Sequence, residues 1–281
     1  MNSIIKPTFI DYNTYLFYIE ELIRDFPFLN AEIQGRTAVG RGIFSLSLGN
    51  RKNSVIIAGG FCGSETLTVN MLLLFCESLS KSVKYGNQLW GVDVKKAFSK
   101  LGVTVIPCVN PDGNEIYLKG FEGAKSLRYY SEARAAESGF RDGNALGVDI
   151  RRNFLTADDY SDPHITGAYK ESEAETRTLT RLCRNREFRS CLTLESGNNL
   201  LLRHGNRPQG AMMAKILADS CGCTYILNPY EPSGFSQWFS DSFKKSAFTI
   251  KTGKGNNPLP ADSLYYDYSR LEEALLLFCL M

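Results

Sequence analysis

Short apolar runs alternate along the chain with segments of helical periodicity. The apolar runs are rich in branched residues and predict buried strands. They begin at Ser54, Val103, Cys191 and Ala247. Apolar positions at helical spacing predict a helix from Thr66 to Leu79 and another after Ser172, where Ser172 and Glu175 have the spacing of a capping box.

This alternation predicts an α/β protein with a mostly parallel or mixed sheet and helices on both faces. We expect one domain over residues 1–281, because the sequence contains no internal repeat, low-complexity tract or Pro/Gly-rich linker. Ligands of such proteins bind at the carboxyl ends of the strands. The candidate functional residues are therefore Cys62, Glu65, residues 110–113, Glu195 and Lys251.

Composition excludes several classes of partner. The 281 residues include 32 basic and 30 acidic side chains, and we find no run rich in Lys or Arg. Neither nucleic acid nor an anionic membrane surface is therefore expected as a partner. The first residues lack the basic start and apolar stretch of a signal peptide, and no apolar run approaches the ~20 residues that span a bilayer, so we expect a cytoplasmic protein.

The eight cysteines are expected to be reduced thiols, most of them buried. Cys221 and Cys223 form a C-x-C pair, but no matching motif elsewhere completes a metal site. The two histidines, His164 and His204, are expected to be structural or exposed.

Several motifs coincide with the predicted strand ends. They are GRTAVGRGIFSLSLG (35–49), GGFCGSET (59–66), VNPDG (109–113), GVDIRRNF (147–154), ESEAETRTL (171–179) and SGFSQWF with FTIKTGKGNNPLP (233–260). In this order they resemble the zinc carboxypeptidase family from about Tyr12 to about Asn257, and the last pair is most similar to the bacterial branch that cleaves γ-D-glutamyl-diamino acid bonds in cell-wall peptides. The resemblance implies a single α/β/α sandwich domain around a central mixed sheet of about eight strands.

The resemblance also implies which residues occupy the metal and catalytic positions. The family binds zinc with a His and a Glu of the first loop and a His of a later strand, and a Glu of the last strand activates the metal-bound water. Here these positions hold Cys62, Glu65, Glu195 and Lys251. A protonated lysine cannot accept the proton of water, and its charge repels a divalent ion ~5 Å away by several kcal/mol. Lys251 is expected to pair with Glu195 or Glu65 instead.

The substrate-binding positions are partly kept. Arg152 stands where the family binds the substrate carboxylate, Arg151 replaces a neighbouring Asn, and Tyr230 lies near the position of a tyrosine that folds over the substrate. Asp149 is present but lacks the histidine that it orients in relatives. Leu146 occupies the position of a further arginine, which polarises the scissile carbonyl; Arg128 and Arg141 are possible substitutes.

Two functions from different classes follow from the resemblance. The leading hypothesis is an inactive pseudopeptidase that binds a peptide with a free C-terminal carboxylate, for example a cell-wall peptide, and needs no cofactor. The alternative is an active metallocarboxypeptidase whose zinc is held by Cys62, Glu65 and Glu195, since thiolate and carboxylate both bind zinc. A third possibility is a structural or regulatory partner of an active relative, and the oligomeric state is not indicated.

Overall fold

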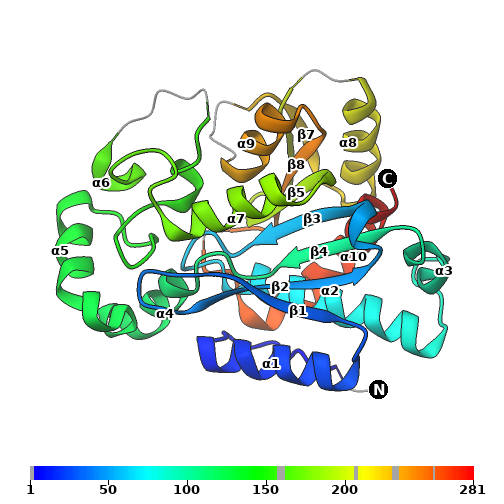
Figure 1. The fold of residues 1–281 in the computed structure, drawn as a ribbon, viewed down its shortest axis with the longest axis horizontal. Coiled ribbons are helices and arrows are strands. Elements are labelled where there is room, and N and C mark those ends of the chain that lie inside the picture. The colour runs from blue at the N-terminus through cyan, green and yellow to red at the C-terminus, as the bar shows by residue number, and fades with distance from the viewer. Residues whose placement is uncertain (1–2, 157–161, 206–207, 230–233, 256) are drawn as a thin grey trace.

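Eight strands form one mixed sheet in the computed structural model, which describes residues 3–156, 162–205, 208–229, 234–255 and 257–281 (Figure 1). The strands are β1 (Asn30–Arg36), β2 (Gly42–Gly49), β3 (Ser54–Gly59), β4 (Gly102–Ile106), β5 (Phe188–Ser196), β6 (Leu200–Arg203), β7 (Thr224–Leu227) and β8 (Ala247–Thr252). Their order is β1-β2-β4-β3-β5-β8-β6-β7. The central strands β4, β3, β5 and β8 are mutually parallel, whereas β2 and β6 run antiparallel to their neighbours β4 and β8.

Helices cover both faces of this sheet. The α-helices are α1 (Tyr12–Asp25), α2 (Thr66–Tyr85), α3 (Val94–Phe98), α4 (Pro111–Lys119), α5 (Arg128–Ser138), α6 (Pro163–Thr166), α7 (Ala174–Asn185), α8 (Pro208–Cys221), α9 (Gly234–Phe243) and α10 (Leu264–Leu280). Short 3₁₀ turns are η1 (Arg51–Asn53), η2 (Gly120–Leu127), η3 (Ile150–Arg152) and η4 (Ala261–Ser263). This arrangement confirms the expected α/β/α architecture. Among the described residues, no helix is long and apolar enough to span a membrane.

The predicted strands are confirmed and form the centre of the sheet. The runs that begin at Ser54, Val103, Cys191 and Ala247 lie in β3, β4, β5 and β8. β5 begins three residues earlier than its apolar run, at Phe188, and α2 continues beyond the predicted end at Leu79. Every residue of β3 and β4 is buried, because helices pack on both sides of these parallel strands.

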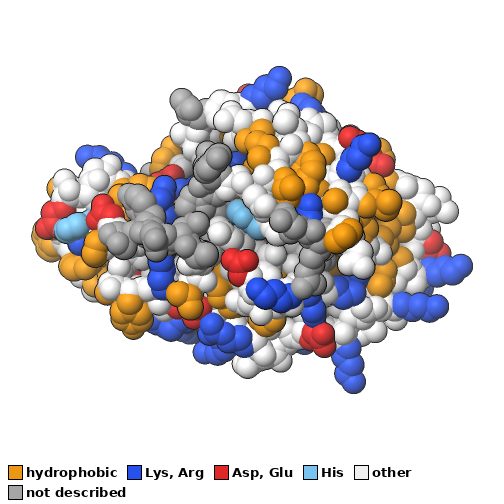
Figure 2. Space-filling view, turned by 90° about the horizontal axis from the view of Figure 1, so that it is seen from above, with side chains coloured by type: hydrophobic (Ala, Val, Ile, Leu, Met, Phe, Trp, Pro, Cys, Tyr) orange, Lys and Arg blue, Asp and Glu red, His pale blue; other side chains and the backbone are white. Residues whose placement is uncertain are grey.

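The two faces of the sheet have separate cores. On one face, side chains of α1, α2, α8 and α10 pack on the sheet, and on the other face side chains of α7 and α9 do so. Figure 2 shows the molecular surface as seen from above the view of Figure 1. Acidic and basic side chains are interspersed on this surface, in keeping with the near-neutral net charge. No strongly charged field therefore marks this face.

The predicted capping box before α7 is wrong. The helix begins at Ala174, and its N-cap residue is Glu173 rather than Ser172. The Ser172 hydroxyl accepts a hydrogen bond from Asn153 Nδ2 and donates to Glu173, and the buried carboxylate of Glu175 accepts from Asn144. Tertiary partners therefore take the groups that the local pattern assigns to the cap.

An aromatic cluster joins three segments that surround the carboxyl ends of the strands. Phe154, the last residue of GVDIRRNF, lies 5.6 Å from Phe235 and 6.1 Å from Trp238 of α9, and 6.4 Å from Phe61 of the loop after β3, measured between ring centroids. All four rings are buried. Their packing fixes these segments relative to one another.

Phe154→Ala should lower the free energy of unfolding by about 3–5 kcal/mol, because it leaves a cavity among rings that cannot close over it. Leu155 is the matched control: it is 61% exposed, and Leu155→Ala should cost less than about 0.5 kcal/mol. Denaturant unfolding followed by Trp fluorescence measures both. Equal costs for the two variants would contradict the role given to the cluster.

Candidate functional site

The candidate site lies at the carboxyl ends of three adjacent parallel strands. β5 pairs with β3 on one side and with β8 on the other. The register of β5 and β8 makes Glu195 and Lys251 direct neighbours, each one residue before its strand ends. The loop after β3 carries Cys62 and Glu65. The fold thus brings together the four residues that the sequence places at the metal and catalytic positions.

The carboxylate of Glu65 is held by backbone groups. Glu65 is the N-cap residue of α2, but its side chain makes no capping hydrogen bond. One carboxylate oxygen accepts from the Cys62 N–H and the other from the Ser196 N–H, both at 3.2 Å. Because Glu65 and Cys62 are only 1% and 3% exposed, these bonds replace water as the partners of the carboxylate.

The VNPDG turn supports this loop. Asn110 accepts a hydrogen bond from Gly113 N and caps α4, while its Nδ2 donates to the Phe61 carbonyl at 3.0 Å. Gly63 lies so close to Gly113 that a Cβ atom at residue 63 would stand 2.4 Å from the Gly113 carbonyl oxygen. The glycine of the first loop is therefore required by the close approach of two backbones.

Glu195 and Lys251 form an ion pair between β5 and β8. The Lys251 Nζ lies 4.0 Å from Glu195 Oε2, and the two side chains are 16% and 4% exposed. A buried carboxylate needs a nearby positive charge, and Lys251 provides it here. This is one of the two pairings expected from the sequence.

Asp149 orients both arginines of GVDIRRNF. Arg151 donates from Nε and Nη2 to the two oxygens of Asp149 at 3.1 and 3.0 Å, and the Nε of Arg152 lies 3.4 Å from Asp149 Oδ2. Asp149 is 2% exposed, whereas the arginine side chains are 29% and 32% exposed. The partly exposed guanidinium groups are thus anchored to a buried carboxylate, a role of Asp149 that the D-x-R-R spacing signals but that the sequence analysis missed.

Burial dominates the titration of the inner side chains. Burial and then the negative charge of Glu195 raise the pKa of Glu65 to about 7, although Arg151 opposes the shift. Burial and the charge of Glu65 raise the pKa of the Cys62 thiol well above its usual range. At neutral pH Cys62 is therefore a thiol rather than a thiolate, and Glu65 is partly protonated.

These donors do not fit a zinc site. Zinc requires deprotonated ligands that converge on one point, but the Cys62 thiol resists ionisation, both Glu65 oxygens accept backbone hydrogen bonds, and Glu195 faces an ammonium group. Within the described ranges, no group of three or more His, Cys, Asp and Glu side chains is placed to hold a metal ion.

Other residues singled out in the sequence have varied positions. Tyr230 lies outside the described residues. Arg128 forms an ion pair with Glu122 and lies over the ring of Tyr129, 5.4 Å from its centroid, so its contacts are within η2 and α5. Arg141 is exposed. The structure gives neither arginine a contact with the four inner residues.

Two buried or partly buried polar contacts around the site were not expected. Asp142 accepts hydrogen bonds at 2.7 Å from the backbone and the hydroxyl of Ser64, which ties the first loop to the segment before GVDIRRNF. Asn144 Nδ2 donates to Glu173 at 2.7 Å and to Glu175 at 3.2 Å, which ties the same segment to α7. The separations of 78 and 29–31 residues leave no local signal in the sequence.

Residues 15–263 match the family described as zinc carboxypeptidase. The chain belongs to the zinc carboxypeptidase family. Among curated proteins, the chain is 27% identical to the uncharacterized protein YqgT of Bacillus subtilis, over 89% of this chain and 72% of that protein. It is 21% identical to gamma-D-glutamyl-L-diamino acid endopeptidase 1 of Lysinibacillus sphaericus, over 92% of this chain and 69% of that protein.

Solved structures share the fold. Thrombin-activatable fibrinolysis inhibitor superposes with a TM-score of 0.76 at 16% identity, covering 97% of this chain and 74% of that chain. The murein-tripeptide amidase MpaA of Escherichia coli O157 superposes with a TM-score of 0.57 at 19% identity, covering 88% and 91% of the two chains. The family resemblance and the fold expected from the sequence are confirmed.

The raised pKa values predict that stability falls as pH increases. Glu65 has a pKa of about 7 and Glu175 one of about 8, both above the ordinary glutamate value of 4.5. The folded protein therefore binds more protons than the unfolded chain between about pH 4.5 and 8, and the free energy of unfolding decreases as pH rises through this window. Asp11 and Glu32, with pKa values of about 2, affect stability only below about pH 4.

Glu65→Gln should remove the part of the decrease in the free energy of unfolding that occurs up to about pH 7, on the order of 1–3 kcal/mol. The part due to Glu175 should remain. Denaturant unfolding at several pH values between about 5 and 8 measures the slope. Glu32→Gln is the control and should leave the slope unchanged in this window. Identical slopes for Glu65→Gln and the unaltered protein would show that Glu65 titrates normally.

Proposed function

We propose that this member of the zinc carboxypeptidase family binds the free C-terminal carboxylate of a peptide without hydrolysing it. The observation that carries the proposal is the Glu195–Lys251 ion pair at the positions where relatives have a zinc ligand and the catalytic glutamate. The cleft then acts as a binding site, and its cations hold the ligand.

The charges of the inner residues support a site that works without metal. Arg151, Arg152 and Lys251 carry three positive charges, and Asp149, Glu195 and the partly protonated Glu65 carry at most three negative charges. A divalent cation added beside Glu195 would be repelled by the ammonium of Lys251, which opposes its binding. The positive charge of Lys251 takes the place that the ion would have.

Hydrolysis also lacks its base. Peptide hydrolysis needs a group that accepts a proton from the attacking water, and a protonated lysine cannot accept one. Glu65 accepts two backbone hydrogen bonds and Glu195 faces Lys251. These contacts occupy the two carboxylates of the inner site.

The arginines support carboxylate binding. Arginine presents a planar fork that pairs bidentately with a carboxylate, and anchoring by Asp149 lowers the entropy lost when the fork binds a ligand. Both side chains are about one-third exposed, which leaves part of each accessible to a ligand. Similarity to an endopeptidase named for gamma-D-glutamyl-L-diamino acid bonds supports a cell-wall peptide as the ligand.

The zinc content of the protein should be well below one equivalent after exposure to zinc and dialysis, as measured by atomic absorption. The combined change Cys62→His, Glu195→His and Lys251→Glu should bring zinc to about one equivalent, because it restores neutral imidazole ligands and removes the repelling ammonium. Leu155→Ala, which leaves Cys62, Glu195 and Lys251 unchanged, is the control and should not change the zinc content. Stoichiometric zinc in the unaltered protein would favour the alternative, an active enzyme with Cys62, Glu65 and Glu195 as ligands.

Peptides with a free C-terminal carboxylate should bind more tightly than their amidated versions by about 1.5–3 kcal/mol, the range for a hydrogen bond to a charged group. Arg152→Ala should erase the difference and Arg151→Asn should reduce it in part, because Arg151 is held by two bonds to Asp149. Calorimetry with matched acid and amide peptides measures the difference.

Arg24→Ala removes an exposed arginine on α1 and is the control, for which the preference should persist. Equal affinity of the unaltered protein for acid and amide peptides would mean that Arg152 has no role in ligand binding. Release of the C-terminal residue from the bound peptide would contradict the absence of hydrolysis while leaving carboxylate binding intact.

A further inference from the structure

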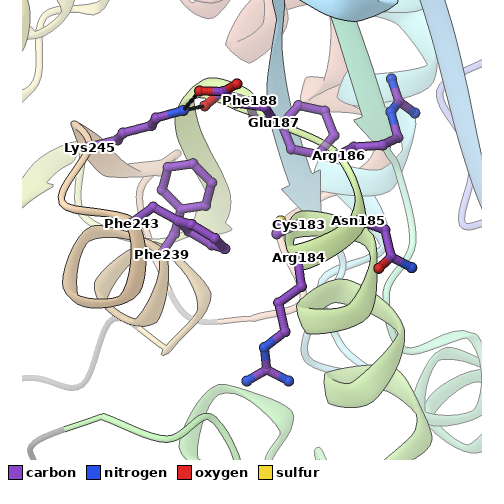
Figure 3. Close-up of a pocket in the computed structure, with 9 residues that line it drawn as sticks. All are labelled: Cys183, Arg184, Asn185, Arg186, Glu187, Phe188, Phe239, Phe243 and Lys245. Carbon is purple, nitrogen blue, oxygen red and sulfur yellow. Dashed lines mark hydrogen bonds and ion pairs between the residues drawn. The ribbon is translucent and has the colours of Figure 1, made fainter.

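Two depressions adjoin one another at the amino ends of β3 and β5. The candidate site lies at the opposite, carboxyl ends of these strands. The first, drawn in Figure 3, has a volume of about 470 Å³ and the second one of about 460 Å³. The first is lined by Cys183, Arg184, Asn185, Arg186, Glu187, Phe188, Phe239, Phe243 and Lys245. The second is lined by Arg51, Lys52, Arg186 and Glu187, so Arg186 and Glu187 line both. Their size suits a small organic ligand.

The first depression has aromatic walls. In Figure 3 the rings of Phe239 and Phe243, from α9, stand across the opening from Phe188 at the start of β5. Phe188 and Phe239 are buried, whereas Phe243 is partly exposed and is the ring that a ligand reaches. At the rim Lys245 donates to Glu187 at 2.9 Å, which neutralises the charge of both groups. This depression therefore suits an aromatic or apolar group.

The second depression is cationic. Arg186 donates from Nη2 to Thr104 Oγ1 at 3.2 Å and lies over the ring of Phe188. No described carboxylate is within ion-pair distance of it, and its Nη1 is buried without a hydrogen-bond partner among the described residues. Lys52 likewise forms no ion pair with a described residue, and Arg51 pairs with Glu32. Burial and the nearby charge of Arg51 lower the pKa of Arg186. Positive charge is thus concentrated here without an equal number of carboxylates.

We propose that these adjoining depressions form a second ligand site, which binds a small aromatic anion. The anionic group lies between Lys52 and Arg186, and the aromatic group lies against Phe243. A carboxylate or a phosphate meets the same requirement, because both accept charge-assisted hydrogen bonds from lysine and arginine. The site shares no residue with the cleft of Arg152, so it is independent of the proposed function.

Phenyl phosphate is the probe that combines both groups, and calorimetry should give a dissociation constant of about 1 mM or tighter. Inorganic phosphate, which lacks the ring, and benzyl alcohol, which lacks the charge, should each bind at least about tenfold more weakly. Phenylacetate in the same experiment distinguishes a carboxylate ligand from a phosphate ligand: the tighter of the two anions identifies the preferred group.

Trp238 reports where the probe binds. Its ring centroid lies 5.5 Å from that of Phe243, and the Trp90→Phe background removes the signal of the exposed Trp90. In this background phenyl phosphate should change the fluorescence with the same dissociation constant as calorimetry. Arg186→Gln and Lys52→Gln should each weaken binding about five- to tenfold, whereas Lys215→Gln, which alters an exposed lysine on α8, should not.

Lys52 is exposed and its side chain supports no other element, so Lys52→Gln decides the matter if Arg186→Gln does not fold. A dissociation constant clearly weaker than about 1 mM would overturn the proposal. So would binding that Lys52→Gln leaves unchanged, or calorimetric binding without a change in Trp238 fluorescence. Loss of binding in Arg152→Ala would instead assign the probe to the cleft and overturn the second site.

Discussion

A buried carboxylate at the end of β5 needs a compensating positive charge, and this need organises the candidate site. The 4.0 Å separation of Glu195 and Lys251 corresponds to an attraction of about 4 kcal/mol at an effective dielectric constant of about 20. Removing both groups from water costs several kcal/mol for each ion, so the pair adds little net stability. The effect of the ion pair is local. It places the positive charge of Lys251, a residue of β8, among the carboxylates of Glu65, Glu195 and Asp149.

The sheet register makes this compensation possible. In the parallel pairing of β5 and β8, direct partners have side chains on the same face, so Glu195 and Lys251 meet wherever the strands pair in this register. Glu65 enters the same space from the other side of β5, because the loop after β3 folds back until Glu65 accepts from the Ser196 N–H. Two carboxylates therefore approach each other, and the charge of Glu195 adds to burial, the larger cause, in raising the pKa of Glu65.

Much of the fold and of the inner site could be predicted from the sequence. The four apolar runs mark the central strands, and the order of the motifs places Cys62, Glu65, Glu195 and Lys251 at one edge, because these residues follow or end those strands. The capping box before α7 failed for a physical reason: Ser172 and Glu175 have tertiary partners in Asn153 and Asn144.

Contacts between distant segments could not be predicted from one sequence. The bond between Ser64 and Asp142 and the pairing of Arg151 and Arg152 with Asp149 depend on how the loops fold over the strand ends. The depression at Arg186 could not be predicted for a similar reason. Lys52 and Arg186 are remote in sequence and come together only at the amino ends of the strands. Nothing in the local composition of either segment indicates that their charges converge.

The charged residues of the inner site are energetically coupled. Lys251 and Arg151 both offset the negative charge of Glu195. Loss of one member of a buried ion pair typically costs about 3–5 kcal/mol. Neighbouring charged residues of this kind do not contribute additively. Arg151 belongs to the same group, since its charge opposes the rise in pKa of both Glu65 and Cys62. The inner site is therefore one network of charges, and the arginines held by Asp149 are its partly exposed members.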